Sequence, residues 1–462
     1  MKKYWSLFLS FIKKPENVFI SLSLLFGVLS AILVPQLSVS DENMHYMRAY
    51  GISQGRVESN SPCTLPKDVI KRAEAVYEGN FSADYSKPID RNIMDVHKCS
   101  SASGYPPIMH LPQTIGIGIA SLFNGSTGLT ILFGRLANAL FYSIAVYLII
   151  KWVRIGKWAF TVIGLIPLMI HMAASLSSDC MTNVAVFTIT AFTLNLFTQK
   201  DKLSHKQTVA LICIGVFLTL TKSVNALLLF PLLFLPKRLF SPNKNEHLPF
   251  NIQKWTILVV TGIAAIISIL IWQKIYGQPL LTTGAAHNPL HSNPIKFITI
   301  LFNTYISPTI GYTDTVLRGS VGEFSSFKYH LPLFVLIPLF SLLSLSLLHY
   351  NKKDQELLGE NTGKLAVYNL ATIGLFVCAV SYAMYTAWAL LPFRFGEGAY
   401  YADGVQGRYF TATAVMLVPV GLWLQKYINV RTKNEKVFNL IMFFGLALIL
   451  SFYVFETVWT YK

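Results

Sequence analysis

Long apolar runs alternate with short polar segments along almost the whole chain. A helix needs about 20 mostly apolar residues to cross the hydrocarbon core of a bilayer, and eleven runs reach or approach that length. The pattern predicts an all-α polytopic membrane protein with about 11 transmembrane helices, within a range of roughly 10 to 13. The runs cover residues 18–35, 127–150, 158–175, 181–198, 208–220, 224–235, 255–275, 331–349, 365–391, 409–424 and 437–459.

The composition supports this class and excludes several others. Only 13% of the 462 residues are charged, which is about half the share in a typical soluble domain. The mean hydropathy is +0.49. A chain this apolar is neither an intrinsically disordered protein nor a coiled coil nor a small secreted protein built on disulfides. We expect residues 1–462 to form a single membrane domain.

The formal net charge of +16 raises the question of nucleic-acid binding. With a cytoplasmic N-terminus, the polar segments on the cytoplasmic side carry 21 Lys and Arg against 7 Asp and Glu, and the rest of the chain carries 17 against 15. This is the positive-inside asymmetry of membrane proteins, so the lipid bilayer is the expected partner and no nucleic acid is needed. The cytoplasmic segments are residues 1–16, 151–157, 199–207, 236–254, 350–364 and 426–436.

The same topology places three polar loops outside the cytoplasm. Residues 36–110 form the first and largest, residues 276–330 the second and residues 392–408 the third. Residues 108–123 are apolar but short and interrupted by polar residues, so we expect an interfacial helix on the outer membrane surface. The alternative, a twelfth span, would reverse the orientation of every later loop. The basic leader before the first run favours a retained anchor over a cleaved signal peptide.

Two of the five cysteines, Cys63 and Cys99, lie in the exported loops, both in the first one. Oxidation is permitted outside the cytoplasm, so we expect a disulfide between them, with two free thiols as the alternative. The spacing of His and Cys residues gives no support to a structural zinc site.

An adjacent pair of acids, Asp41 and Glu42, directly follows the first apolar run. Carboxylates beside the hydrocarbon are costly, which makes the pair a candidate catalytic site. Asp41 can take a proton from an acceptor hydroxyl, or hold a divalent cation such as Mg²⁺ or Mn²⁺ against a phosphate. His45 shares a face with Asp41 if this stretch is helical. The structural alternative is that the pair, with Ser40, starts a helix.

The stretch GVQGRYF at residues 404–410 ends the third outer loop. Its two glycines let the backbone approach a ligand closely, and the planar guanidinium of Arg408 suits a phosphate or diphosphate. Gln406 and Tyr409 are neighbouring candidates for substrate contact. The alternative is that Arg408 extends to lipid headgroups.

Three further charged residues lie inside or beside apolar runs. Lys222 occupies a tight turn between two runs, Arg135 lies within the second run, and Asp179 lies at an outer boundary. A charge near the hydrocarbon costs roughly 2.5–3.5 kcal/mol on insertion scales, so each needs a partner. For Lys222 we favour a substrate phosphate. For Arg135 and Asp179, a site facing the phosphate and an internal ion pair are both open.

In chain order, these motifs resemble a bacterial membrane family known as domain of unknown function 2142. The resemblance rests on the acidic pair, on Tyr105-Pro106-Pro107, Ser178-Asp179 and Thr221-Lys222, and most specifically on the Gly-x-Gln-Gly-Arg-Tyr stretch ending at Tyr409. That family in turn looks like the C-type glycosyltransferase superfamily, whose members use sugars linked to polyprenyl phosphates.

The resemblance implies a C-type glycosyltransferase-like fold and an integral glycosyltransferase of the hexosyltransferase type in the bacterial plasma membrane. Such enzymes move a sugar from a polyprenyl phosphate or diphosphate to an acceptor at an extracytoplasmic site. Asp41 with Glu42 matches the catalytic acidic pair, and Lys222 and Arg408 match phosphate-contacting bases. We expect no soluble C-terminal domain like that of oligosaccharyltransferases, which favours a cell-surface or cell-wall glycan as acceptor.

Three other functions stay open on the sequence. They are a transporter or flippase for lipid-linked sugars, a polysaccharide polymerase or ligase, and a non-catalytic assembly protein. The enzyme hypothesis requires Asp41, Lys222 and Arg408 to share one water-accessible chamber, whereas a non-catalytic protein would leave them far apart.

Overall fold

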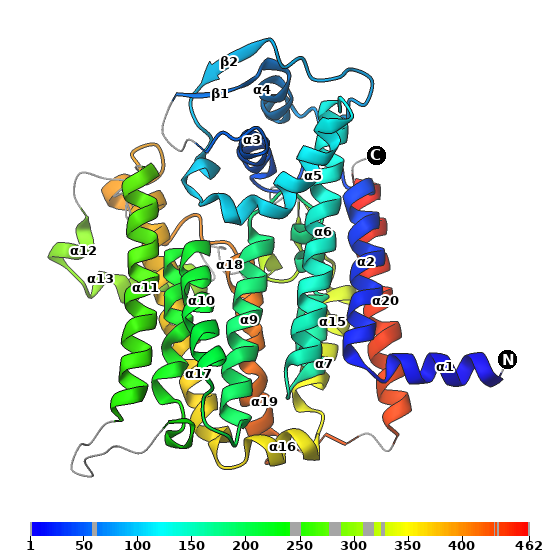
Figure 1. Cartoon of the computed structure of the whole chain (residues 1–462), viewed down its shortest axis with the longest axis vertical. Coiled ribbons are helices and arrows are strands. Elements are labelled where there is room, and N and C mark those ends of the chain that lie inside the picture. The colour runs from blue at the N-terminus through cyan, green and yellow to red at the C-terminus, as the bar shows by residue number, and fades with distance from the viewer. Residues whose placement is uncertain are drawn as a thin grey trace.

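Six of the apolar runs form helices long and apolar enough to cross a membrane (Figure 1). The computed structural model describes residues 2–57, 62–240, 251–276, 288–307, 318–324, 329–428, 430–431 and 434–460. Within these residues the six helices are α2 (Pro15–Leu33), α6 (Thr127–Trp152), α9 (Asp179–Thr198), α11 (Ile252–Tyr276), α17 (Asn361–Met384) with its π-helical continuation η6 (Tyr385–Ala389), and α20 (Glu435–Thr460).

Shorter apolar helices complete the bundle. They are α10 (His205–Thr221), η4 (Ser223–Phe234), α15 (Leu333–Leu348), and the consecutive α18 (Arg408–Thr411), η8 (Ala412–Leu417) and α19 (Val418–Leu424). The protein is an all-α membrane protein, and the count of about 11 spans stays a prediction.

One predicted span, residues 158–175, is divided into α7 (Lys157–Gly164) and α8 (Pro167–Ala173). Proline has no backbone N–H and disfavours a helical conformation in the residue before it. Ile166, directly before Pro167, is accordingly extended, with ψ at 132°.

Helix α9 lies at the centre of the bundle. In its apolar stretch 94% of the residues are buried, against 17% in α11, because α9 packs against α6, α10 and η8. Asp179 is the first residue of α9, so this acid lies inside the bundle at one of its two ends.

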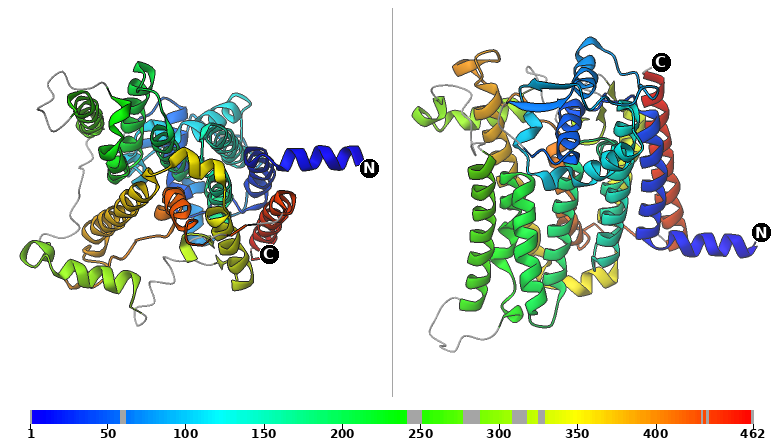
Figure 2. Two further views of the ribbon diagram at one scale, coloured as in Figure 1. Left: turned by 90° about the horizontal axis from the view of Figure 1, so that it is seen from below. Right: turned by 45° about the horizontal axis from the view of Figure 1, so that its top comes forward.

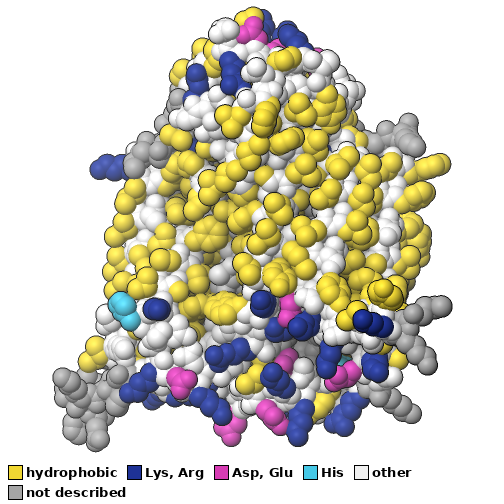
Figure 3. All heavy atoms as spheres, turned by 45° about the vertical axis from the view of Figure 1, so that its right-hand side comes forward, with side chains coloured by type: hydrophobic (Ala, Val, Ile, Leu, Met, Phe, Trp, Pro, Cys, Tyr) yellow, Lys and Arg dark blue, Asp and Glu magenta, His cyan; other side chains and the backbone are white. Residues whose placement is uncertain are grey.

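The outward faces of the helices are apolar. On α11, Val259, Ile263, Ile266 and Leu270 are all exposed, and hydrophobic side chains cover the middle of the molecule (Figure 3). Lys and Arg side chains gather at the lower end in that view, where α16 (Lys352–Leu358) lies (Figure 1). We call this the basic end and the opposite one the loop end.

The segment between α2 and α6 folds into a cap over the loop end (Figure 1). Tyr46 and Tyr50 pack with Val69 and Ile70 in a small core of its own. The cap contains α3 (Glu42–Ser53), α4 (Lys67–Glu74), the antiparallel strands β1 (Cys63–Pro66) and β2 (Met94–His97), and the 3₁₀ turns η1 (Ala75–Glu78), η2 (Ser101–Gly104) and η3 (Pro107–His110).

A disulfide joins Cys63 to Cys99, the pairing expected from the sequence. It fastens the start of β1 to the chain just after β2. The other three cysteines, Cys180, Cys213 and Cys378, are free.

Residues 108–123, for which we expected an interfacial helix, form most of η3 and α5 (Leu111–Leu122). The 12 residues of α5 rise about 18 Å, which is short of the roughly 30 Å of a hydrocarbon core. Leu111, Ile115 and Ile119 form an exposed apolar stripe, while another face packs on α6. The length of α5 therefore disfavours a twelfth span.

Helix α1 (Lys2–Ile12) projects sideways from the bundle at the basic end (Figure 2). Part of the predicted loop 276–330 lies outside the described residues. Its described elements are α12 (Pro289–Ser292), α13 (Lys296–Tyr305), β3 (Glu323–Phe324) and β4 (Tyr329–His330), and the remaining short turns of the chain are η5 (Lys237–Leu239) and η7 (Gly396–Gly398).

Candidate active site

Four charged side chains from distant parts of the chain meet beneath the cap. Arg408 Nη2 donates to Asp41 Oδ2 at 2.5 Å, and Arg408 Nε lies 3.6 Å from Asp179 Oδ2. Lys222 Nζ donates to Asp179 Oδ1 at 2.8 Å. We call Asp41, Asp179, Lys222 and Arg408 the charged quartet. Of the two possibilities for Asp179, the structure thus shows the internal ion pair. Its partner is Lys222, for which we favoured a substrate phosphate.

The backbone of Asp41 directs its carboxylate toward Arg408. Its φ of 62° lies in the left-handed region, where a non-glycine residue is strained. Asp41 is the N-cap of α3, but its side chain makes no capping hydrogen bond. The side chain is 56% exposed, against 10% for Arg408. The helix start considered as the structural alternative is present, yet it leaves the Asp41 carboxylate accessible.

The two cations of the quartet keep donors for a further acceptor. Arg408 Nη1 donates to Ser40 O at 3.4 Å and Nη2 donates to Asp41, which leaves one N–H group on each of these two nitrogens, while the buried Nε faces Asp179. The Lys222 ammonium has three donors and gives one to Asp179. The Tyr409 ring lies 4.7 Å from Lys222 Nζ and 5.7 Å from the Arg408 guanidinium carbon, so its face supports both cations.

One member of the quartet, Asp41, lines a cavity of about 550 Å³, a volume within the range of small-molecule sites. Arg408 and Lys222, with 10% and 21% of their side chains exposed, do not line it, but both contact the lining residue Tyr409. The predicted residues His45, Gln406 and Tyr409 line it too. The other lining residues are Met44, Ser101, Ala102, Tyr105, Met384, Trp388, Arg394, Asp403 and Gly404.

Three of these lining residues, Trp388, Arg394 and Asp403, did not emerge from the sequence. The Arg394 guanidinium lies 4.7 Å from the Trp388 ring centroid and 3.6 Å from Asp403 Oδ2. That oxygen is buried and accepts no hydrogen bond. Trp388 lies in η6, a π-helical turn of the kind frequent at functional sites. The sequence feature that could have indicated Arg394 and Asp403 is that both charged residues lie in the predicted outer loop 392–408.

His45 and His110 form a buried pair at the cavity wall. His45 Nδ1 and His110 Nε2 are 2.8 Å apart, and the His45 ring stacks on Tyr105 with centroids 6.0 Å apart. Burial lowers the pKa of His45 to about 4 and lowers the pKa of His110 well below its usual value. Both imidazoles are therefore neutral at pH 7, so His45 can hydrogen-bond a substrate hydroxyl without adding positive charge.

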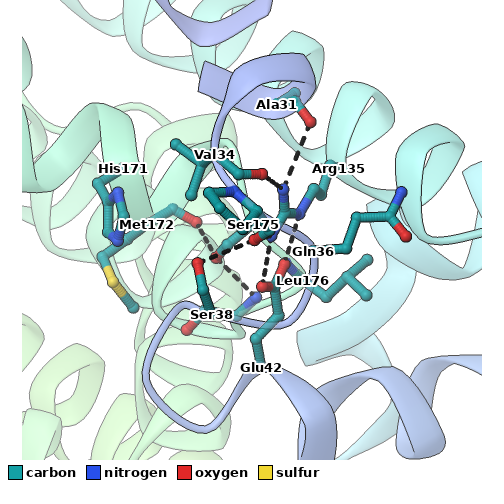
Figure 4. A network of polar contacts seen from close by, with 12 residues as sticks. Ala31, Val34, Gln36, Ser38, Glu42, Arg135, His171, Met172, Ser175 and Leu176 are labelled. Carbon is teal, nitrogen blue, oxygen red and sulfur yellow. Dashed lines mark hydrogen bonds and ion pairs between the residues drawn. The ribbon is translucent and has the colours of Figure 1, made fainter. Parts of the chain in front are cut away.

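Glu42, the other acid of the expected catalytic pair, does not line the cavity and points toward Arg135 (Figure 4). Its oxygens accept hydrogen bonds from Arg135 Nε at 2.7 Å and Nη2 at 2.6 Å, and neither side chain is exposed. Leu176 N also donates to Glu42 at 3.1 Å, and Arg135 donates to the carbonyl oxygens of Val34 and Pro35. The catalytic assignment of Glu42 and the phosphate assignment of Arg135 therefore do not fit the structure, in which the pair fastens the cap to α6.

The donor set does not fit a divalent cation. Asp41 and Asp179 each pair with a cation of the quartet, which a metal ion would have to displace. Among the described residues, no group of three or more His, Cys, Asp or Glu side chains is arranged to hold a metal ion. The expectation of Mg²⁺ or Mn²⁺ at Asp41 thus gains no support.

The fold and the site define a helical membrane protein with a charged chamber beneath a folded cap. The family model described as "Predicted membrane protein (DUF2142)" matches residues 24–417, which include the whole quartet. The chain therefore belongs to this family of predicted membrane proteins. No curated protein and no solved structure matches it.

Proposed function

We propose that this protein is an integral membrane glycosyltransferase. It would move a sugar from a polyprenyl phosphate or diphosphate to an acceptor outside the cytoplasm, as enzymes of the C-type superfamily do. The meeting of Asp41, Lys222 and Arg408 in one charged cluster, of which Asp41 lines the cavity, supports the proposal most directly. Sugar transfer needs a base for the acceptor hydroxyl and positive charge for the departing phosphate, and the cluster supplies both.

The proposed reaction begins with the ion pair between Asp41 and Arg408. The carrier phosphate replaces Asp41 on Arg408 and takes the free donors of Arg408 and Lys222. The acceptor hydroxyl attacks the anomeric carbon and its proton passes to Asp41. The bond from that carbon to the phosphate oxygen breaks, and its electron pair stays on the oxygen. The two cations stabilise the negative charge that builds up there.

The wall formed by Trp388, Arg394 and Asp403 suits a sugar. The Trp388 ring offers an apolar face for the carbon side of a pyranose. Asp403 Oδ2, which accepts no hydrogen bond although Arg394 lies 3.6 Å away, offers an acceptor for a sugar hydroxyl. A polar acceptor such as a cell-surface or cell-wall glycan fits a wall of this kind.

The charge distribution supports an orientation with the basic end in the cytoplasm. Lys and Arg gather at that end (Figure 3), as the positive-inside rule requires of the cytoplasmic side. The cap, with its disulfide, would then lie outside the cytoplasm, where oxidation is permitted. We place the protein in the bacterial plasma membrane with its N-terminus inside.

Ligand binding tests the carrier assignment. We expect the purified protein to bind a short polyprenyl phosphate at least 10-fold more tightly than the corresponding polyprenol. Arg408→Gln should abolish this preference, whereas Arg91→Gln, an exposed arginine of the cap that does not line the cavity, should keep it. Equal binding of phosphate and alcohol by the wild-type protein would refute the carrier assignment.

Transfer from polyprenyl phosphates that bear labelled hexoses tests the reaction. Asp41→Asn should lower the transfer rate at least ~100-fold, the usual contribution of a general base. The control Asp95→Asn alters an exposed acid of β2 away from the cavity and should leave the rate unchanged. A rate for Asp41→Asn equal to wild type would remove Asp41 from the mechanism. Passage of the labelled lipid across sealed vesicles without a new glycosidic bond would identify a transporter instead.

A further inference from the structure

A second cavity, of about 270 Å³, lies at the basic end. It is bordered by Lys13 in the turn between α1 and α2, by Arg154 between α6 and α7, by Lys353 on α16 and by Asn439 on α20. These residues come from four separate parts of the chain. The fold therefore brings three cations together around one hollow far from the charged quartet.

Three of the cations at this cavity form no ion pair within the part of the chain that the structure describes. The side chains of Lys13, Arg154 and Lys353 form no ion pair or hydrogen bond with any described residue, although Lys157 nearby pairs with Glu16 at 3.8 Å. All three are exposed. Their positive charge is therefore available to a ligand.

The buried part of the cavity holds an unpartnered polar group. Asn439 is only 7% exposed and lines the cavity, and its side-chain amide makes no hydrogen bond with any described residue. The polar atoms of this amide are not shielded from water, so they are open to a ligand in the cavity. A ligand with hydrogen-bonding oxygens would satisfy it.

Two acids also border the cavity, and one of them is already engaged. Asp354 Oδ2 accepts a hydrogen bond from Gly156 N at 2.8 Å, which turns that oxygen toward the backbone. Glu435, at the start of α20, is exposed. Counted with Lys157, four cations and two acids line the cavity, so it attracts anions.

We propose that this cavity binds the phosphate headgroup of an anionic phospholipid. Arg154, Lys353 and Lys13 contact the phosphate, and Asn439 hydrogen-bonds the headgroup oxygens. Basic pockets between transmembrane helices at the cytoplasmic surface are typical sites for such headgroups. The assignment does not depend on the proposed glycosyltransferase activity.

Helix α1 favours a lipid over a soluble phosphate as the ligand. It leaves the bundle sideways (Figures 1 and 2), and Lys13, the residue after its last turn, borders the cavity. Its residues Tyr4, Trp5, Leu7 and Phe11 are exposed, and such a helix lies in the membrane interface with its apolar side chains among the lipids. The cavity thus opens at the level of the lipid headgroups.

Binding of labelled phosphatidylglycerol to the purified protein tests the proposal, with phosphatidylcholine as the neutral lipid. We expect the wild-type protein to bind the anionic lipid at least 10-fold more tightly, and the double variant Arg154→Ala/Lys353→Ala to lose this preference. Lys352→Ala is the matched control, because Lys352 is the neighbour of Lys353 on α16 but pairs with Glu356 and does not line the cavity. Asn439→Leu should weaken binding without any change of charge.

Three outcomes would overturn the proposal. One is equal binding of the two lipids by the wild-type protein. Another is an equal loss in Lys352→Ala and the double variant, since this would mean unspecific surface attraction. The third is full competition by millimolar inorganic phosphate, which would assign the site to a soluble phosphate. Melting temperatures of all variants, measured without added lipid, show that each is folded.

Discussion

Asp41 and Glu42 are adjacent in the sequence but have opposite surroundings. Asp41 lies at the cavity and pairs with Arg408, whereas Glu42 is buried against Arg135. The left-handed backbone of Asp41, with φ at 62°, separates the directions of the two side chains. One acid is thus available for chemistry and the other stabilises the site that holds it.

The two acids should respond differently to the same substitution. Glu42→Gln leaves Arg135 as an uncompensated buried charge, and breaking a buried ion pair in this way typically costs ~3–5 kcal/mol. We expect a clear drop in melting temperature for Glu42→Gln and little change for Asp41→Asn, as measured by thermal unfolding in detergent. An unchanged melting temperature for Glu42→Gln would show that the ion pair does not fasten the cap.

Asp354 at the basic end makes stability depend on pH. Burial raises its pKa from 3.8 to about 6. The carboxyl group of Asp354 therefore binds a proton more tightly in the native state than in the unfolded chain. Protonation of Asp354 stabilises the fold at low pH, and this contribution is lost as the pH rises from about 4 to 6. Asp354→Asn keeps an acceptor for Gly156 N and carries no charge.

The Asp354→Asn variant should be more stable than wild type at pH 8, by up to ~3 kcal/mol. The difference should shrink as the pH falls below 6 and vanish near pH 4. Melting temperatures of both proteins across this range provide the measurement. A difference that does not vary with pH would show that ionisation of Asp354 is not its cause.

At the scale of elements, the loop before α18 fits closely against the π-helical turn η6. Gly404 has φ at 84°, and a Cβ atom built there would lie 2.5 Å from Trp388 Cδ1 and 2.8 Å from Met384 Cε. Only glycine fits this position without strain. The contact between the two elements thereby sets the position of Trp388 in the cavity wall.

Gly404→Ala should displace Trp388 and lower sugar transfer at least ~10-fold, because a shift of about 1 Å in a positioning group has large kinetic effects. Gly398→Ala is the matched control, since that glycine lies in the same loop with open space around it. Transfer rates and tryptophan fluorescence of both variants are the measurements. Equal rates for the two variants would mean that the loop contact does not shape the site.

At the scale of the whole molecule, charge divides the two ends. The basic end carries the Lys and Arg clusters (Figure 3), and the cap covers the other end. If the positive-inside rule sets the orientation, the cap faces outward and α16 faces the cytoplasm.

Cysteine labelling in intact cells should reveal this orientation. Lys87 of the cap and Lys352 of α16 are both highly exposed, with 69% and 78% of their side chains accessible. In a background where the exposed Cys213 and Cys378 are serine, a membrane-impermeant maleimide should label Lys87→Cys and leave Lys352→Cys unlabelled until the cells are permeabilised. The reverse pattern would place the cap in the cytoplasm.

Much of the site could be predicted because its residues are unusual for their surroundings. Asp41, Asp179, Lys222 and Arg408 are charges at the edges of apolar runs, and such charges need partners. The same argument also selected Arg135, but this residue forms a buried ion pair with Glu42 and does not line the cavity. Trp388 was not predicted because an aromatic residue is common in an apolar run, and Asp403 was not predicted because an acid is common in a polar loop.

The apolar runs and the basic segments are local properties of the chain, and a bilayer acts on each stretch by itself. The sequence alone therefore determined that this is a helical membrane protein of its family and which segments are basic. The sequence alone did not determine which charged residues pair with one another. Arg408 and Asp41 are 367 residues apart, and Arg135 and Glu42 are 93 apart. Packing of distant helices decides such contacts, so only the tertiary structure showed which acid faces the chamber and which supports it.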